Sequence, residues 1–542
     1  MTINNTDNAD QHTLKFPLQR VRGQGWGAVI EIMDTTLRDG EQTSGVSFAP
    51  HEKVSIARLL LEELNVDRIE IASARVSDGE FESVQKVAQW AAQHGHIDKL
   101  EVLGFVDETA SLEWIQRAGC RTVNLLCKGS LNHCTHQLRK TVEEHLADIK
   151  GVIANAVNRN ITVNVYLEDW SNGMRNSEEY VYQMVDELQH QPIKRFMLPD
   201  TLGILNPDEA HAFCKKMIER YPNLHFDFHA HNDYDLAVAN VYEALKAGVR
   251  GVHVTVNGLG ERAGNAPLTS VLALISDHLK MKTHIAEKNV FRVSKVVESY
   301  SGIRIPNNKP VIGDNVFTQV AGVHADGDNK KNLYFNDLLP ERFGRTREYA
   351  LGKTSGKANI KKNLEALGIE LDDNSMKKVT ARIIELGDKK EVVSQDELPY
   401  IVSDILKNGE DKENIRILNY SLTLTKELRP MATVKIVING EEHQQTAAGY
   451  GQYNAFSKAM YKIYKKLGKP TPELLDYVVV IPPGGQTDAF VQTIITWQFN
   501  DKVFKTRGLD PDQTVAAIKA TIKMLNMIET GNIPSINYMA LP

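Results

Sequence analysis

Two histidines at the end of an alternating apolar stretch are the residues in this chain best suited to bind a metal ion. The run Leu224–Phe228 leads directly into His229 and His231. On an extended strand, residues two positions apart point to the same face, so both imidazoles can reach one ion. Asn232 and Asp233 follow and can orient them. This spacing indicates a metal site, although histidine pairs of this kind also occur on surfaces and in cores without a metal.

The chain around this pair alternates between short β-rich runs and amphipathic helical segments, from Ala28 to about Lys282. Eight strand–helix units in about 250 residues predict a (β/α)8 TIM barrel. This number of units is larger than that of a typical doubly wound sheet. The predicted strands are Val29–Met33, Val66–Ala72, Leu100–Phe105, Thr122–Cys127, Ile161–Leu167, Arg195–Leu198, Leu224–Phe228 and Gly251–Val256. Helical periodicity lies between them, for example at His51–Leu64, Phe81–His94, Val142–Asn158 and Asp233–Ala247.

Polar side chains follow most of these strands at their carboxyl ends, where the active sites of such barrels lie. They include Asp34–Gln42, Ser73 with Arg75, Glu168–Asp169, Pro199–Gly203, the histidine pair, and Asn257–Asn265. Random placement on the surface would scatter such groups over both rims of the barrel. Their concentration therefore favours a functional site at one rim.

Length and composition limit the remaining possibilities. A chain of 542 residues is too long for one core and predicts two or three domains. The net charge of -6 offers no basic surface for nucleic acid or for a membrane. The 4 cysteines lack the spacing of a zinc site and suit a reducing compartment. The polar stretch Met1–Arg20 lacks a signal-peptide core, and no apolar run could span a bilayer, so we expect a frayed lead-in and a soluble cytoplasmic protein.

The sequence changes character twice after the barrel. We expect the barrel at 28–289, helical linker subdomains at 290–412 and a C-terminal regulatory domain at 416–531. The last region repeats a unit of three strands and a helix, a duplicated βββα pattern whose helices are predicted at Tyr453–Leu467 and Gln513–Leu525. Such a module is typical of ligand binding or dimerisation, and a purely structural cap is the alternative.

Three motifs in combination resemble those of the acetyl-CoA-dependent Claisen synthases, the family of 2-isopropylmalate, citramalate and homocitrate synthases. They are Leu37–Gln42 followed by Lys53, His229–Asp233, and Gly258–Asn265. The resemblance covers about residues 28–530 and is closest to the bacterial (R)-citramalate synthases, through Val163–Gly173, Ala321–Asp328 and Ile481–Gly485. It implies a metal-dependent barrel followed by a linker and a C-terminal regulatory domain.

The resemblance implies that acetyl-CoA, as co-substrate, is joined to a 2-oxo acid at a divalent metal ion. Asp39, His229 and His231 would bind the ion, and Asn265 would add a ligand or a neighbouring contact. The ion would chelate the oxo acid and act as a Lewis acid. Zinc, manganese and magnesium all suit such a donor set, and the sequence does not choose between them.

Further roles follow from the same resemblance. Arg38 would stabilise the developing alkoxide, and Thr201 would form a hydrogen bond to the substrate carboxylate. Without a substrate role, Arg38 would be a surface arginine and Thr201 a turn cap.

The resemblance also implies that either Glu168 or His324 would be the base that removes a proton from the acetyl methyl group, with Tyr334 and the neighbouring Asn332 completing that part of the site. Because the linker extends beyond its own barrel, His324 and Tyr334 would reach the barrel of a neighbouring subunit. The functional unit would then be a homodimer.

The side chain of the oxo acid would lie against Leu103, Leu126 and Tyr166, which match the bulky apolar residues of a citramalate-type pocket. Filling that space favours the methyl group of pyruvate over the isopropyl group of 2-oxoisovalerate, although such pockets discriminate by only about 1–3 kcal/mol per methylene. As barrel residues, all three would be core in most proteins. Asn124 stands where the 2-isopropylmalate type usually has histidine, which also favours pyruvate.

Two departures from the family pattern concern other positions. Asp235 stands where glycine is usual after the histidine pair. In the C-terminal module, Tyr453 and Asn454 occupy a place where an aspartate would bind the amine of an effector, so feedback inhibition by isoleucine or leucine is a hypothesis.

The predicted reaction is the condensation of acetyl-CoA with pyruvate to (R)-citramalate and CoA, in isoleucine formation. The nearest alternative uses 2-oxoisovalerate in leucine formation. More distant alternatives are an acyl-CoA carbon–carbon lyase, which generally lacks the duplicated module, and a non-catalytic amino-acid sensor, which the intact set of site residues disfavours.

Overall fold

The computed structural model describes residues 29–319, 333, 335–352, 356–366, 369–388, 393, 398, 401–402, 405, 415–480, 491–500 and 502–531. The described residues fall into two compact units. The first comprises the residues up to Phe317 together with Phe335–Arg347, and the second comprises the rest.

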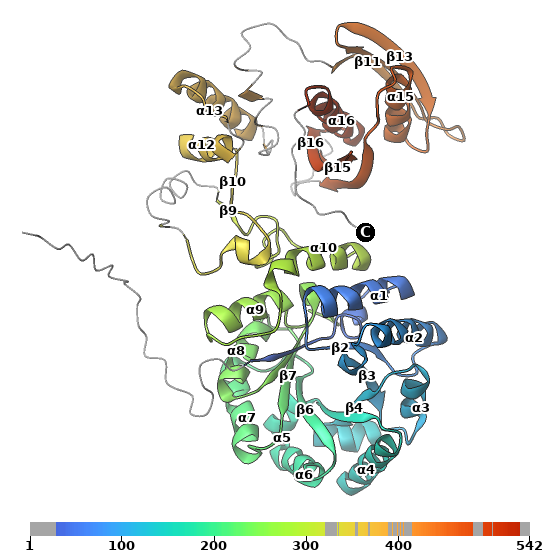
Figure 1. Cartoon of the computed structure of the whole chain (residues 1–542), viewed down its shortest axis with the longest axis vertical. Helices are drawn as coiled ribbons and strands as arrows, with labels where there is room; N and C mark the ends of the chain where they lie inside the picture. Colours follow the sequence, from blue (N-terminus) through green and yellow to red (C-terminus); the bar gives the residue numbers. More distant parts are fainter. Residues whose placement is uncertain are drawn as a thin grey trace, which may run out of the picture. The chain divides into compact units, whose positions relative to one another are not determined.

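Eight parallel strands close the first unit into a barrel in the order β1 to β8 (Figure 1). The strands are β1 (Glu31–Asp34), β2 (Arg68–Ser73), β3 (Leu100–Phe105), β4 (Thr122–Lys128), β5 (Thr162–Glu168), β6 (Ile193–Asp200), β7 (Phe226–Ala230) and β8 (Gly251–Val254). The register of β8 against β1 pairs Val254 with Asp34 and closes the ring. The predicted TIM barrel is confirmed.

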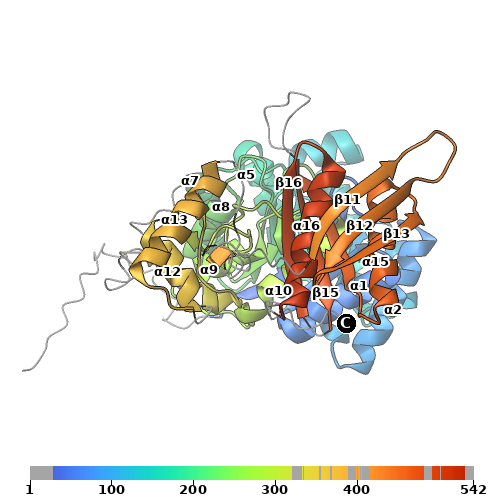
Figure 2. The same cartoon turned by 90° about the horizontal axis from the view of Figure 1, so that it is seen from above.

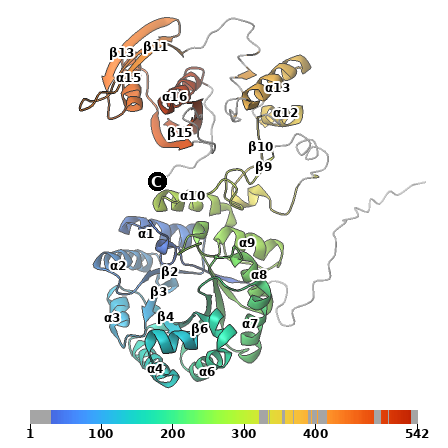
Figure 3. The ribbon, with the colours of Figure 1, turned by 180° about the vertical axis from the view of Figure 1, so that it is seen from behind.

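Helices surround this barrel, and Figure 3 shows them from behind. They are α1 (Pro50–Arg58), α2 (Asp78–Gln93), α3 (Ala110–Arg117), α4 (Val142–Asn158), α5 (Trp170–Asn176), α6 (Glu178–Leu188), α7 (Pro207–Arg220), α8 (Ala237–Ala247) and α9 (Leu268–Asp277), followed by α10 (Val290–Ser301). Several begin at a side-chain cap, as α4 does where Thr141 accepts a hydrogen bond from the backbone N–H of Glu144.

The predicted start of α8 was wrong. The helix expected from Asp233 begins only at Ala237, because Asp235 has the left-handed φ of 58° and the Asn232 side chain accepts a hydrogen bond from the Ala237 N–H. A residue in the left-handed backbone conformation cannot continue a right-handed α-helix. Glycine adopts that conformation more easily than any other residue. This conformation suits the glycine that the resemblance implies at position 235.

The interior of the barrel holds a buried ionic cluster. The Arg68 guanidinium on β2 lies 2.6 Å from Asp227 Oδ2 on β7 and 3.0 Å from Glu101 Oε1 on β3. Strands β2 and β7 are not neighbours, so the Arg68–Asp227 contact crosses the interior. A Cβ atom on Gly251 would lie 2.0 Å from Asp227 Oδ1, so only glycine fits beside that carboxylate.

All four cysteines of the chain, Cys120, Cys127, Cys134 and Cys214, are buried and unpaired in this unit. Burial raises the pKa of each thiol.

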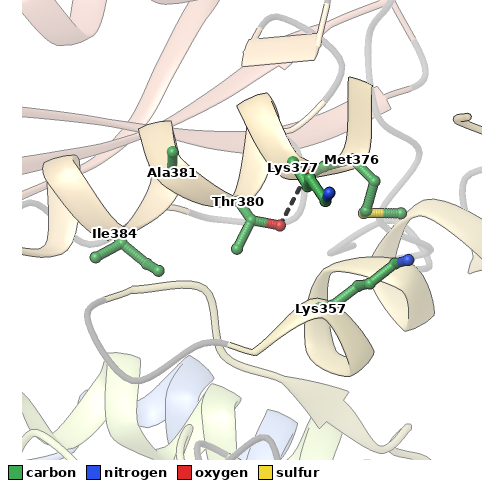
Figure 4. A pocket seen from close by; sticks show the side chains of 6 residues that line it. All are labelled: Lys357, Met376, Lys377, Thr380, Ala381 and Ile384. Atoms are coloured by element: carbon green, nitrogen blue, oxygen red, sulfur yellow. Dashed lines mark hydrogen bonds between the residues drawn. The ribbon is translucent and has the colours of Figure 1, made fainter. Parts of the chain in front are cut away.

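The second unit contains α12 (Lys357–Ala366), α13 (Asp373–Asp388) and two antiparallel sheets. Helices α12 and α13 share a small apolar core. Beside them lies a shallow cavity of about 270 Å³, whose lining includes Lys357, Met376 and Ile384 (Figure 4). There, the Thr380 hydroxyl donates to the backbone oxygen of Met376, and Lys357 pairs with Asp373.

The two antiparallel sheets confirm the predicted duplication of a βββα unit. Sheet β11 (Ile415–Thr423), β12 (Met431–Ile438) and β13 (Glu441–Ala448) carries α15 (Gln452–Lys466), and sheet β14 (Glu473–Val480), β15 (Val491–Phe499) and β16 (Lys502–Asp510) carries α16 (Gln513–Glu529) (Figure 2). Apolar residues of both halves, including Phe456 and Trp497, belong to one core. The halves therefore bury their apolar faces together.

The ionic cluster leads to a prediction about stability. Replacing Arg68 with leucine leaves Glu101 buried without its paired arginine and leaves Asp227 with only the more distant Arg195 guanidinium, whose NH1 atom is 3.9 Å away. Breaking a buried pair in this way costs about 3–5 kcal/mol. We expect a loss of that size in the free energy of unfolding of the barrel in urea. Arg121→Leu is the matched control, because Arg121 and Asp98 pair with 62% and 81% of their side chains exposed and should contribute little. Equal stability of the two variants would contradict this account.

Candidate active site

Asp39, His229 and His231 meet at the carboxyl end of the barrel strands. Asp39 follows β1, where its backbone N–H donates to the oxygen of Thr35 over 2.8 Å. The Asp39 Oδ2 atom lies 3.3 Å from His229 Nε2 and 3.8 Å from His231 Nε2. Among the described residues, these three form a group of buried donor atoms that all lie within 4.8 Å of one another, as a single metal ion requires.

Unpartnered atoms in this group show that it fits a metal ion. Asp39 Oδ1, His229 Nδ1, His231 Nδ1 and the neighbouring Asn265 Oδ1 are buried and have no hydrogen-bond partner among the described residues. Burying such atoms without a partner is costly, and a cation would satisfy oxygen atoms that face it. Asn265 is held by its Nδ2 atom, which donates to the oxygen of Leu259, and by a β-bridge to His231. Its oxygen is therefore available to the site.

The electrostatic surroundings of Asp39 and His231 favour the protonation states that bind a cation. Burial alone would raise the pKa of Asp39, but Arg38 and the two histidines outweigh it and hold that pKa well below its usual range. Burial, together with the neighbouring His229, lowers the pKa of His231 to about 4. An ionised carboxylate and a neutral imidazole are the forms that bind metals.

Arg38 is fixed beside this group by a chain of buried polar side chains. Its Nε atom donates to Glu70 Oε2 over 2.5 Å, and its NH1 atom lies 3.2 Å from Asp39 Oδ2. Glu70 also accepts from Asn124 over 2.7 Å, and Asn124 accepts from Asn164 over 2.8 Å. No partner was predicted for Arg38 from the sequence. The alternation of β2, β4 and β5 places Glu70, Asn124 and Asn164 on the inward face, and this signal could have identified them.

Leu103 and Tyr166, with Leu126 packed against them, form a small apolar cluster that is separate from the main core. The structure thus brings together the three residues predicted to contact the oxo acid, and it adds Met33 and Met197. The Tyr166 ring lies 6.0 Å from the Arg38 guanidinium and 6.0 Å from the His229 ring. The cluster therefore borders the candidate metal group.

The remaining predicted residues form contacts other than those with the candidate metal group, or lie outside the described part of the chain. Glu168, at the end of β5, forms an ion pair with Lys128 at the end of β4. This partner was not predicted from the sequence. The Thr201 hydroxyl accepts a hydrogen bond from the Asp169 N–H over 2.9 Å, so it supports a turn and can still donate its own hydrogen. His324, Asn332 and Tyr334 lie outside the described residues.

The predicted effector residues lie at the start of α15. The Tyr453 hydroxyl is 2.7 Å from the hydroxyl of Thr521 on α16, and Asn454 accepts a hydrogen bond from the Tyr450 N–H. Both contacts stabilise the module itself, and binding of an effector here stays a prediction.

Three domain models match successive parts of the chain: HMGL-like at residues 29–297, homocitrate synthase post-HMGL domain-like at 311–391, and LeuA allosteric (dimerisation) domain at 392–529. The (R)-citramalate synthase CimA of Methanocaldococcus jannaschii is 32% identical over 502 residues, which are 92% of this chain and 99% of that protein. A putative (R)-citramalate synthase of Methanopyrus kandleri is 32% identical over 504 residues, or 92% and 96% of the two chains. A probable 2-isopropylmalate synthase of the same organism is 32% identical over 506 residues, or 92% and 98%.

The chain belongs to the family of citramalate and 2-isopropylmalate synthases. It is therefore an acyltransferase, as the sequence predicted. Family membership does not separate the two activities, because relatives of either name are equally similar to this chain. None of the helices in the described part of the chain has the length and apolar character needed to cross a membrane.

The donor group leads to a prediction about metal binding. We expect the protein to bind one divalent ion per chain, and Asp39→Asn to reduce its affinity for Mn²⁺ at least 10-fold, because the substitution removes the negative charge among the donors. Calorimetric titration of metal-free protein with Mn²⁺ measures this directly. His211→Gln, which alters a histidine on α7 that pairs with Glu243, is the control and should leave the affinity unchanged. Full affinity in the Asp39 variant would show that the ion binds elsewhere.

Proposed function

We propose that this protein condenses acetyl-CoA with pyruvate and water to give (R)-citramalate and CoA. The observation that carries the proposal is the apolar cluster of Leu103, Leu126 and Tyr166 beside Arg38 and the candidate metal group. A 2-oxo acid held by its keto and carboxylate oxygens would direct its side chain toward such a cluster. A cluster filled by two leucines and a tyrosine would accept only a small substituent.

The polar residues of the chain supply the other requirements of the reaction. Asp39, His229 and His231 would hold a divalent ion, which would supply Lewis-acid polarisation of the keto group. The Arg38 guanidinium, held by Glu70, would stabilise negative charge that develops on the keto oxygen. Its ion pairs with Glu70 and Asp39 keep it in one orientation, so little reorganisation is needed during the reaction.

Glu168 and His324 remain the two alternatives for the base that takes a proton from the acetyl methyl group. Glu168 is partly exposed and paired with Lys128, so its carboxylate is held in one place while one face stays accessible. The new carbon–carbon bond forms between that methyl carbon and the keto carbon. Water then cleaves the thioester and releases CoA as a free thiol.

A second function is supported by a specific observation. The probable 2-isopropylmalate synthase of Methanopyrus kandleri is as similar to this chain as the putative citramalate synthase of that organism. Condensation with 2-oxoisovalerate is therefore the alternative. It requires the cluster of Leu103, Leu126 and Tyr166 to admit an isopropyl group.

Measuring free CoA thiol in the presence of acetyl-CoA and a divalent metal separates these functions. We expect release with pyruvate and little with 2-oxoisovalerate or 2-oxoglutarate, because each added methylene costs about 1–3 kcal/mol in a closed pocket. A preference for 2-oxoisovalerate would establish the alternative. Absence of release with all three acids, in metal-loaded protein, would refute both functions.

The match to a LeuA dimerisation domain supports a homodimer. Our proposal adds that His324 and Tyr334 complete the site of the neighbouring subunit. We expect Asp39→Asn and His324→Ala to be inactive alone and to regain activity when mixed, since a mixed dimer contains one intact site. Each variant refolded with itself is the control. If mixing restores nothing while sedimentation shows mixed dimers, each site is built from one chain.

A further inference from the structure

The hydroxyl group of Tyr166 is bound to a second residue in the barrel. Its oxygen lies 2.9 Å from Nδ1 of His253 on β8. The ring belongs to the apolar cluster with Met33, Leu103 and Met197. The aromatic ring therefore forms part of the candidate pocket wall, and the hydroxyl group ties that wall to β8.

His253 is in turn held by the ionic cluster. Its Nε2 atom lies 3.2 Å from Asp227 Oδ2, and the same carboxylate oxygen is 2.6 Å from the Arg68 guanidinium. A carboxylate paired with arginine accepts hydrogen bonds only, so Nε2 of His253 carries the proton. In the neutral imidazole, Nδ1 is then an acceptor. The Tyr166 hydroxyl consequently donates to His253, and His253 donates to Asp227.

This chain of hydrogen bonds is shielded from water. Tyr166, His253 and Asp227 are 2%, 1% and 0% exposed, respectively. They come from β5, β8 and β7, so the chain connects strands on different sides of the barrel. If the Tyr166 ring moved away from the cluster, a buried acceptor would be left without a donor, and no water could replace it. The ring is therefore expected to hold its place when a larger substrate presses against it.

We propose that His253 is a positioning residue for substrate selection, which fixes the Tyr166 ring through their hydrogen bond and so excludes 2-oxo acids with side chains larger than that of pyruvate. This inference rests on the proposed function, because it takes the apolar cluster as the site of the oxo acid's side chain. His253 itself touches no substrate in this account. It acts only through Tyr166.

The ratio of kcat/KM for pyruvate to kcat/KM for 2-oxobutyrate tests this role. The two acids differ by one methylene group, and the ratio does not depend on the fraction of active enzyme. Tyr166→Phe keeps the ring and removes only the hydroxyl. We expect it to lower the ratio roughly 5-fold, the size expected for loss of one neutral hydrogen bond. His253→Leu should lower the ratio at least as much, and the double variant should lower it no further than His253→Leu.

Tyr180→Phe is the matched control. Tyr180 is also a buried tyrosine of this unit, and its hydroxyl donates to the backbone oxygen of Lys128 over 2.9 Å, away from the cluster. It should leave the ratio unchanged. If His253→Leu does not fold, the comparison of Tyr166→Phe with Tyr180→Phe still decides the question.

Two results would overturn the inference: an unchanged ratio in Tyr166→Phe, or an equal loss of kcat/KM for both acids in His253→Leu, as a purely structural residue would give. The wild-type protein tests the proposed function separately. If it releases no CoA with any 2-oxo acid, the proposed function fails. If it releases CoA normally and the variants keep its ratio, only the role of His253 fails.

Discussion

The ionic contact between Arg68 and Asp227 determines which other side chains can form hydrogen bonds in the interior of the barrel. A guanidinium and a carboxylate tolerate burial only when paired and hydrogen-bonded, so each side chain is committed to its partners. Asp227 uses its remaining acceptor capacity for His225 and His253, and His253 accepts from Tyr166. The position of an aromatic ring beside the candidate metal group thus depends on an ion pair from two other strands.

Alternation along single strands gives each strand two tasks. On β7, Asp227 belongs to the ionic cluster, and His229, two residues later, belongs to the candidate metal group. On β2, Arg68 and Glu70 divide in the same way, since Glu70 holds Arg38. Residues two positions apart on a strand face the same side. Each supporting side chain is therefore two residues away from a side chain at the site. These site residues therefore lie on barrel strands that are themselves held by buried ion pairs inside the barrel.

The fold and the common face of His229 and His231 could be predicted because their signals are local, whereas Asp39 was assigned to the donor group through the family resemblance. The strand periodicity identified the barrel, and the spacing of His229 and His231 placed both imidazoles on one face of an extended chain. The contacts that support the site are not local: Arg68 and Asp227 are 159 positions apart, and Arg38 and Glu70 are 32 apart. A period of two shows which face a residue occupies, but not which residue of a non-adjacent strand it meets. The catalytic and effector roles stay predictions, since they depend on bound molecules that periodicity does not describe.

Because every cysteine is buried, the thiols of the protein should not interfere with an assay that detects free thiol. Its four thiols are inaccessible and their raised pKa values keep them protonated, so they react slowly with thiol-specific dyes. A coloured signal in a mixture with acetyl-CoA then comes from released CoA alone. The same four thiols become reactive when the barrel opens. Their rate of labelling by such a dye therefore reports how often the barrel unit unfolds, without any introduced cysteine.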